Sequence, residues 1–136
     1  MYEEAIMKAG IIGDHTFVVT KDMLASAAGS GTVDVFSTPV LIAKMEGTAM
    51  RSVMPYLEDG KATVGTHLDI RHTDATPEGM NVSIHSELIE ISENGKFLKF
   101  KVEAHDERGI IGSGIHERAI INIKRFMEKV NEKKSG

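Results

Sequence analysis

The chain has 136 residues, a net charge of −4 at pH 7 and no cysteine. This length suffices for a substantial hydrophobic core, so we expect residues 1–136 to form a single domain. The acidic balance argues against a nucleic-acid partner, which would favour a basic surface. Without cysteine the chain has no disulfide, thiol nucleophile or thiolate metal site, which fits a reducing compartment.

The first residues, M-Y-E-E-A-I-M-K, lack the basic and then apolar pattern of a signal peptide. No apolar run reaches the length that a membrane-spanning helix needs. We therefore expect a soluble, cytoplasmic protein that does not bind a membrane.

A strand and a short helix are the first predicted elements. Residues 11–20, I-I-G-D-H-T-F-V-V-T, are rich in β-branched side chains and predict a strand. Residues 21–28 favour a short helix. The stretch 29–32, G-S-G-T, then predicts a flexible loop, which either covers a site or is an ordinary connection.

A long helix is predicted next, within residues 37–57. Thr38 is a candidate N-cap and Pro39 suits the first helical position. Apolar residues then recur at helical spacing, at Ile42, Met45, Ala49, Met50 and Val53. Glu46 falls within this stripe, and a carboxylate that faces a core must be paired, neutralised or functional. Thr38 lies about 80° from Glu46 around the helix axis, so both side chains are able to border one cleft.

From residue 62 the hydrophobic period changes to two, which predicts a strand. One face carries Ala62, Val64, Thr66, Leu68 and Ile70. The same alternation places His72 on this apolar face, directed toward the interior that Glu46 faces. Taken alone, such a histidine is more often structural than catalytic.

Three further strands and a terminal helix complete the chain. The strands are predicted over 80–91, 96–106 and 110–123, and the charged helix over 124–134 with Phe126 and Val130 on its inner side. Asn94-Gly95 is a strong hairpin signal. In the last strand, Gly112 and Gly114 mark bulges or positions of close approach.

Tight turns between strands predict antiparallel neighbours, and the long apolar helix is the element able to cover the sheet. The expected architecture is an α+β hotdog fold, a curved antiparallel sheet wrapped around one long central helix. Such a sheet has exposed edges, so we expect a homodimer in which a second copy protects them.

Several segments together resemble the fluoroacetyl-CoA thioesterase family of hotdog proteins. They are F-S-T-P-V-L-I-A-K-M-E at 36–46, P-Y-L-E at 55–58, G-T-H-L-D-I-R-H-T-D-A-T-P at 65–77, A-H-D at 104–106 and G-S-G-I-H-E-R-A at 112–119. The resemblance covers nearly the whole chain from about residue 11. Their order and spacing match, apart from about two extra residues near the Asn94-Gly95 turn.

The resemblance implies a catalytic set of threonine, glutamate and histidine, which matches Thr38, Glu46 and His72. It also implies that Gly65 and Arg118 hold the CoA thioester. Periodicity alone leaves other roles open for these last two residues: Gly65 as a strand kink, and Arg118 as a surface charge. The remaining strand histidines, His67, His85, His105 and His116, have no ligand spacing, and we interpret them as non-ligands.

The implied activity is hydrolysis of a short-chain acyl-CoA without a metal or a separate cofactor, since CoA is part of the substrate. Glu46 would attack the thioester or activate water, Thr38 would position a group or act as nucleophile, and His72 would transfer protons. Two alternatives are a hotdog hydratase or dehydratase and a non-catalytic acyl-CoA-binding or sensor module. Where the fluoroacetyl-specific enzyme has two lid phenylalanines, this chain has Gly29 and Thr32, which leaves the acyl group open.

Overall fold

The computed structural model describes residues 6–135. Most of the N-terminal stretch 1–8 that lacks a signal-peptide pattern lies outside these residues. The helices and strands are β1 (Ile12–Val18), η1 (Lys21–Met23), α1 (Ala25–Ala28), α2 (Thr38–Val53), η2 (Met54–Tyr56), β2 (Lys61–His72), β3 (Asn81–Ile91), β4 (Phe97–Asp106), β5 (Gly109–Asn122), α3 (Ile123–Asn131) and η3 (Glu132–Lys134).

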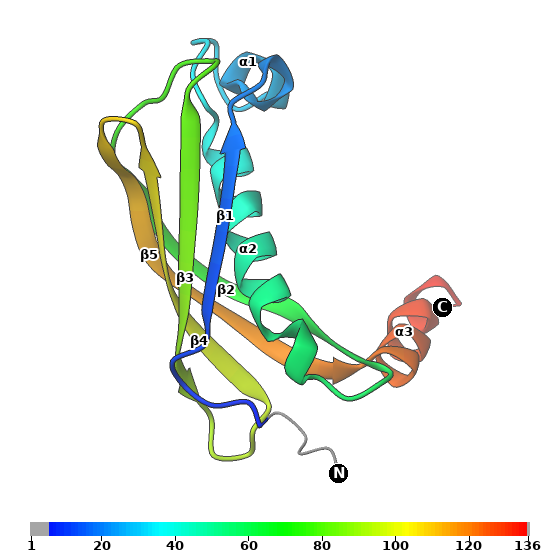
Figure 1. Cartoon of the computed structure of the whole chain (residues 1–136). Helices are drawn as coiled ribbons and strands as arrows, with labels where there is room; N and C mark the ends of the chain where they lie inside the picture. Colours follow the sequence, from blue (N-terminus) through cyan, green and yellow to red (C-terminus); the bar gives the residue numbers. More distant parts are fainter. Residues whose placement is uncertain (1–5, 136) are drawn as a thin grey trace.

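The strands form one antiparallel sheet in the order β1-β3-β4-β5-β2 within the described residues. This sheet curves around α2, which lies against its inner face (Figure 1). The predicted α+β class, a curved antiparallel sheet around one long helix, is confirmed. Strands β1 and β2 are the two edges, because each pairs with a single neighbour.

Not every pair of consecutive strands is adjacent. The connections at Asn94-Gly95 and at 107–109 are hairpins, as predicted, and Gly95 has the positive φ of 73° that such a turn requires. However, β2 pairs with β5 and not with β3. The implied β2–β3 neighbourhood was wrong because residues 73–80 form a crossing connection that carries the chain past β5 and β4.

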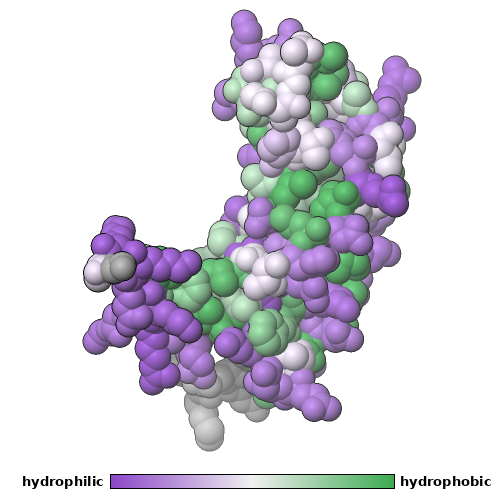
Figure 2. All heavy atoms as spheres, turned by 180° about the vertical axis from the view of Figure 1, so that it is seen from behind, coloured by the Kyte–Doolittle hydropathy of each residue, from purple (hydrophilic) through white to green (hydrophobic). Residues whose placement is uncertain are grey.

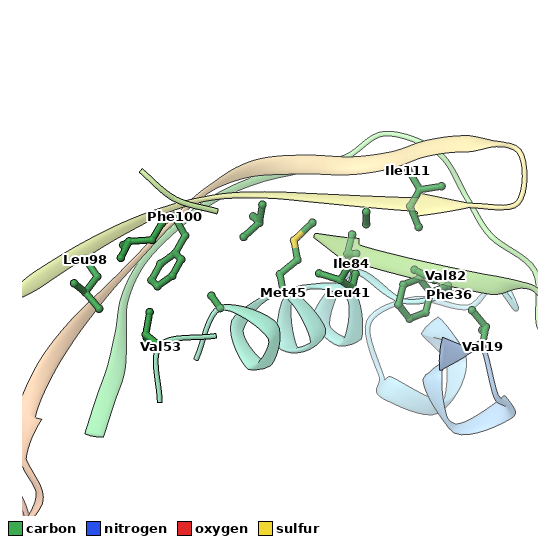
Figure 3. Close-up of a cluster of buried hydrophobic side chains, with 14 of the residues drawn as sticks. Val19, Phe36, Leu41, Met45, Val53, Val82, Ile84, Leu98, Phe100 and Ile111 are labelled. Atoms are coloured by element: carbon green, nitrogen blue, oxygen red, sulfur yellow. The ribbon is translucent and has the colours of Figure 1, made fainter. Parts of the chain in front are cut away.

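The core lies between α2 and the sheet, where Leu41, Met45 and Val53 face strand residues such as Ile84 and Phe100 (Figure 3). The buried residues of α2 are Leu41, Met45, Thr48, Ala49 and Val53. The predicted stripe was therefore partly wrong, since Ile42 and Met50 are only half-buried. Leu41 and Ile42 are both apolar, so the pattern alone did not choose between two orientations that differ by one residue.

Two glycines of β5 let β2 approach closely. A Cβ atom at Gly114 would collide with the Asp69 backbone carbonyl, and one at Gly112 would lie 3.0 Å from the Arg71 carbonyl oxygen. Real Cβ atoms are rarely accommodated at such distances, so the predicted close approach is confirmed. These glycines fix the pairing of β2 with β5.

A bulge in β2 reverses the expected alternation of its side chains. The register of β2 against β5 shifts between Gly65 and His67, which leaves Thr66 as the extra residue. Thr63 and Gly65 therefore share the inner face with Leu68, Ile70 and His72. The prediction was right for the second half of the strand and wrong for Ala62 and Val64, which lie on the outer face.

The paired ends of β2 and β5 extend away from the body as an arm that carries α3 (Figure 1). The predicted terminal helix is present, but Phe126 and Val130 remain 36% and 39% exposed. Apolar residues gather at the corner between this arm and the body (Figure 2). A single chain therefore leaves the apolar side of α3 largely uncovered.

Candidate active site

Thr38 and His72 meet through a hydrogen bond between Thr38 Oγ1 and His72 Nδ1, at 2.7 Å. Ser37, and not Thr38 as predicted, is the N-cap of α2, and its Oγ accepts a hydrogen bond from the Val40 N–H at 3.3 Å. Thr38 is the first helical residue. Because Ser37 takes the capping role, the Thr38 hydroxyl is available for the imidazole.

His72 is half-buried at the end of β2, and its ring makes a T-shaped contact with the Phe36 ring at a centroid distance of 6.3 Å. Burial lowers the pKa of His72 below its ordinary value of 6.5, while the backbone and carboxylate of Asp74 act in the opposite direction. The ring is therefore mainly neutral at pH 7. Its second nitrogen, Nε2, is buried without a hydrogen-bond partner in the described structure. A neutral imidazole bonded to a hydroxyl is suited to accept that hydroxyl's proton.

A cavity of about 300 Å³ opens at this pair. Its walls come from the start of α2, the end of β2 and the segments that follow α1 and β2; they include Ala25, Ser30, Val35, Phe36, Ser37, Thr38, His72, Thr73, Asp74 and Ala75. Ser30 belongs to the predicted loop 29–32. That loop therefore forms part of the cavity wall next to the threonine–histidine pair.

Glu46 lies at the border of the buried stripe on α2, and its side chain is 37% exposed. Its Oε2 is 3.9 Å from Arg118 Nη1 and only 2.7 Å from the position that a Cβ atom at Gly65 would occupy. The expectation of a carboxylate aimed into the core was wrong in degree, since Glu46 sits beside the core and faces a cation. The absence of a side chain at Gly65 leaves room for the carboxylate.

Arg118 is buried on the inner face of β5, with 5% of its surface exposed. Its Nε donates to Thr63 Oγ1 at 2.8 Å, Nη2 donates to the Thr63 carbonyl at 3.0 Å, and Nη1 donates to His116 Nε2 at 3.0 Å. The alternative that Arg118 is a surface charge is wrong. Arg118 alternates with Glu117 and Ala119 along β5, and its side chain lies on the face directed to the interior.

His116 and Thr63 are site residues that sequence reasoning missed. Both lie on the inner face beside Arg118, and His116 is fully buried. The alternation of Gly112, Gly114, His116 and Arg118 along β5 was a usable signal, because residues two apart share a face of a strand.

One chain therefore contains two separate groups of candidate residues, Thr38 with His72 and Glu46 with Gly65 and Arg118. Gly65 and His72 are seven residues apart on β2, a span of about 23 Å in an extended strand. The Glu46 carboxylate lies against Gly65 and not against His72. The predicted meeting of all three catalytic side chains is not formed within one chain.

Among residues 6–135, no three histidine, aspartate or glutamate side chains are grouped so that they could hold a metal ion. In the same part of the chain, no helix is both long and apolar enough to cross a membrane.

The fold and the inner-face site define a hotdog protein of the α+β class. The family model described as "Fluoroacetyl-CoA-specific thioesterase" matches residues 19–124. The chain therefore belongs to the fluoroacetyl-CoA-specific thioesterase family, which confirms the resemblance found in the sequence.

Individual relatives agree with this membership. A fluoroacetyl-CoA thioesterase of Streptantibioticus cattleyicolor is 41% identical over 100 residues, covering 74% of this chain and 70% of the relative. A structure of the fluoroacetyl-CoA thioesterase FlK superposes with a TM-score of 0.88 at 35% identity, over 93% of this chain and 97% of the other. A mutant of FlK in complex with fluoroacetate and CoA gives a TM-score of 0.82 at 35% identity, over 88% and 99% of the two chains. A thioesterase superfamily member of Thermus thermophilus gives 0.85 at 25% identity, over 99% and 96%.

Proposed function

We propose that this protein is an acyl-CoA thioesterase that hydrolyses a short-chain acyl-CoA to the free acid and CoA, using Thr38, Glu46 and His72. The observation that carries the proposal is the 2.7 Å bond between the Thr38 hydroxyl and the His72 imidazole at a cavity of about 300 Å³. The relatives named for acyl-CoA thioester hydrolysis, one of them solved with CoA, support the same chemistry.

The working form is a homodimer in which each active site takes residues from both copies. Edge strand β2 has a free side, and an unpaired edge is available for pairing with a second chain. Antiparallel pairing of β2 with its own copy, centred on Asp69, would set Leu68 opposite Ile70 and, across the bulge at Thr66, Gly65 of one chain opposite His72 of the other. Cross-strand neighbours point to the same face, and both residues face inward here. The Glu46 carboxylate beside Gly65 would then lie close to the second chain's His72.

Hydrolysis adds water across the C–S bond, so that oxygen joins the acyl carbon and the sulfur leaves with a proton. Glu46 either attacks the carbonyl to give a mixed anhydride that water opens, or removes a proton from the attacking water. His72, neutral and bonded to Thr38, moves the proton toward the departing thiolate. The backbone N–H of Gly65 and the guanidinium of Arg118 offer donors for the thioester oxygen as it gains charge. No metal or separate cofactor enters these steps.

A subunit-mixing experiment tests the shared site. Glu46→Gln and His72→Ala should each abolish thiol release from acetyl-CoA. If the residues act across the dimer, unfolding and refolding the two variants together restores about a quarter of wild-type activity, because half of the dimers are mixed and each has one complete site. If mixing restores nothing although mixed dimers form, Glu46 and His72 do not act across the interface.

Product analysis tests the reaction itself. Purified protein is incubated with a panel of acyl-CoAs while free thiol and enoyl absorbance are followed. Thiol release that is lost in Glu46→Gln and in His72→Ala supports the thioesterase. An enoyl change without thiol identifies a hydratase or dehydratase, and binding without turnover identifies a sensor module; either result overturns the proposal.

The proposal includes a cytoplasmic location, which the absence of cysteine supports.

A further inference from the structure

The buried histidine of β5 has a hydrogen-bonding state that its two neighbours define completely. His116 Nδ1 is 2.9 Å from the His67 backbone carbonyl, which only accepts, so Nδ1 carries a proton. Its Nε2 is 3.0 Å from Arg118 Nη1, which only donates, so Nε2 carries none. The ring is therefore the neutral Nδ1–H tautomer.

In this tautomer, His116 Nε2 accepts the third hydrogen bond that the Arg118 side chain donates, after the two to Thr63. A guanidinium has five N–H donors, and three of them are used by Thr63 and His116. The remaining donors are on Nη1 and Nη2, and Nη1 lies 3.5 Å from where a side chain at Gly65 would begin. Gly65 keeps that position clear of a side chain of its own, and the Glu46 carboxylate lies next to it, with Oε2 3.9 Å from Nη1. The second Nη1 donor, which Thr63 and His116 do not use, thus lies beside the space where the thioester oxygen is proposed to bind.

We propose that His116 is a positioning residue for the thioesterase reaction: in its neutral form it orients Arg118 toward the substrate, and its protonation releases that arginine. The inference rests on the proposed function, because it assigns the substrate as the ligand of Arg118. Both ring nitrogens of His116 are engaged by protein groups, so it acts on the substrate through Arg118 and not by a hydrogen bond of its own.

Protonation removes the lone pair that accepts the hydrogen bond from Arg118 Nη1 and places a second cation 3.0 Å from the first. The charged groups around the ring are Arg118 and Glu117 on β5 and Glu46 on α2, while β4 contributes the Phe100 ring and β2 the His67 carbonyl. Burial lowers the pKa of His116 most and Arg118 lowers it further, whereas the His67 carbonyl, Glu46 and Glu117 raise it. The balance keeps the ring neutral at pH 7.

The test uses the dimeric protein and an acetyl-CoA analogue in which a methylene replaces the sulfur, so that the carbonyl is kept and hydrolysis is impossible. Calorimetry gives its Kd from pH 5 to pH 8. His116→Leu should raise the Kd about 10-fold or more at pH 7.5, because Nη1 loses its acceptor, and the difference from wild type should shrink in acid, where the wild-type imidazole is protonated. His116→Gln, whose amide oxygen can replace Nε2 as the acceptor, should bind within about threefold of wild type at pH 7.5 and lose the weakening that the wild type shows in acid. His105→Gln, the same change at an exposed histidine, should leave the whole profile unchanged.

A folded His116→Leu that binds as tightly as wild type at pH 7.5 overturns the inference, and so does a His116→Gln that keeps the acid weakening. An additive effect of His116→Leu and Arg118→Ala on Kd also overturns it, because a residue that acts only through Arg118 adds nothing once Arg118 is gone. The ¹⁵N shifts of the imidazole check the tautomer without any ligand, and an Nε2–H form refutes it. Failure of the proposed function gives a different result: the analogue binds normally, but acetyl-CoA releases no thiol.

Discussion

Thr38 Oγ1 and His72 Nδ1 are 2.7 Å apart although 34 residues separate them in the chain. Thr38 occupies the first helical position of α2, and His72 is the last residue of β2, so the contact joins the start of the central helix to the end of the edge strand. Ser37 caps the helix in place of Thr38. The threonine hydroxyl is therefore not used for capping and bonds the imidazole.

Replacing Thr38 with valine should lower kcat for acetyl-CoA by about 10²-fold with little change in KM, because the hydroxyl is lost while the shape is retained. Thr38→Ser should keep most of the activity. Steady-state kinetics with thiol detection measures both. Thr48→Val on the same helix is the matched control, since the Thr48 hydroxyl bonds only the Lys44 carbonyl in the described structure. A Thr38→Val enzyme with wild-type kcat would remove the hydroxyl from the mechanism.

Gly65→Ala should lower turnover by about 10- to 100-fold and leave the melting temperature nearly unchanged. Its methyl group would lie 2.7 Å from Glu46 Oε2, and a flexible carboxylate can move away at the expense of its position. Gly114→Ala should instead lower the melting temperature. Its methyl group would collide with the Asp69 backbone, which cannot move without breaking the β2–β5 pairing. Thermal unfolding and kinetics of both variants separate the two roles. A stable, fully active Gly65→Ala would show that the carboxylate has no required position.

The sequence pattern predicts the central helix, the Asn94-Gly95 hairpin and the close approach at Gly114, because each depends on interactions between residues near in sequence or on backbone sterics. The half of β2 that carries His72 was also assigned to the correct face. The bulge at Thr66 was not predicted, since nothing in the local period distinguishes an extra residue from a continuous strand. Uninterrupted alternation along β2 therefore assigns Gly65 to the outer face, whereas the bulge places it on the inner face.

The separation between Glu46 and His72 within one chain could not be predicted from local sequence patterns, for a different reason. Helical periodicity gives the angle between Thr38 and Glu46, but not which strand residue each one meets. That depends on how far β2 runs alongside α2 and on the tilt of the helix, which tertiary packing decides. His116 was missed because its lack of ligand spacing was taken as decisive, although alternation along β5 places it on the same face as Arg118.

Acid should weaken the fold through half-buried His72 and buried His116. The pKa values of His72 and His116 are lowered in the folded protein, in both cases mainly by burial, from an ordinary value of 6.5. Between the folded and unfolded pKa values the unfolded chain binds more protons, so the free energy of unfolding rises with pH. Its histidine contribution is complete above about 6.5 and is lost as the pH falls through the lowered values. The melting temperature should therefore be flat from pH 7 to 8 and decline below pH 6.5.

His116→Gln should reduce that decline, because one titrating group is removed. His105→Gln is the control, since His105 is exposed and its loss should not alter the slope. A His116→Gln protein with the wild-type slope would mean that His116 has the same pKa in both states.

The wild type should hydrolyse acetyl-CoA and fluoroacetyl-CoA with kcat/KM values within about tenfold of each other. The loop after α1 contributes Ser30 to the cavity wall. The resemblance noted in the sequence implies lid phenylalanines at the positions of Gly29 and Thr32, whose rings this chain lacks. Exchanging one hydrogen for fluorine changes size less than a methylene does, and a pocket distinguishes even a methylene by only about 10- to 200-fold. Thr32→Phe should raise the ratio by adding an apolar ring to the loop, and Thr16→Phe on β1 is a control at an exposed threonine. A wild-type preference above 10³-fold for fluoroacetyl-CoA would show that fluorine is recognised without those rings.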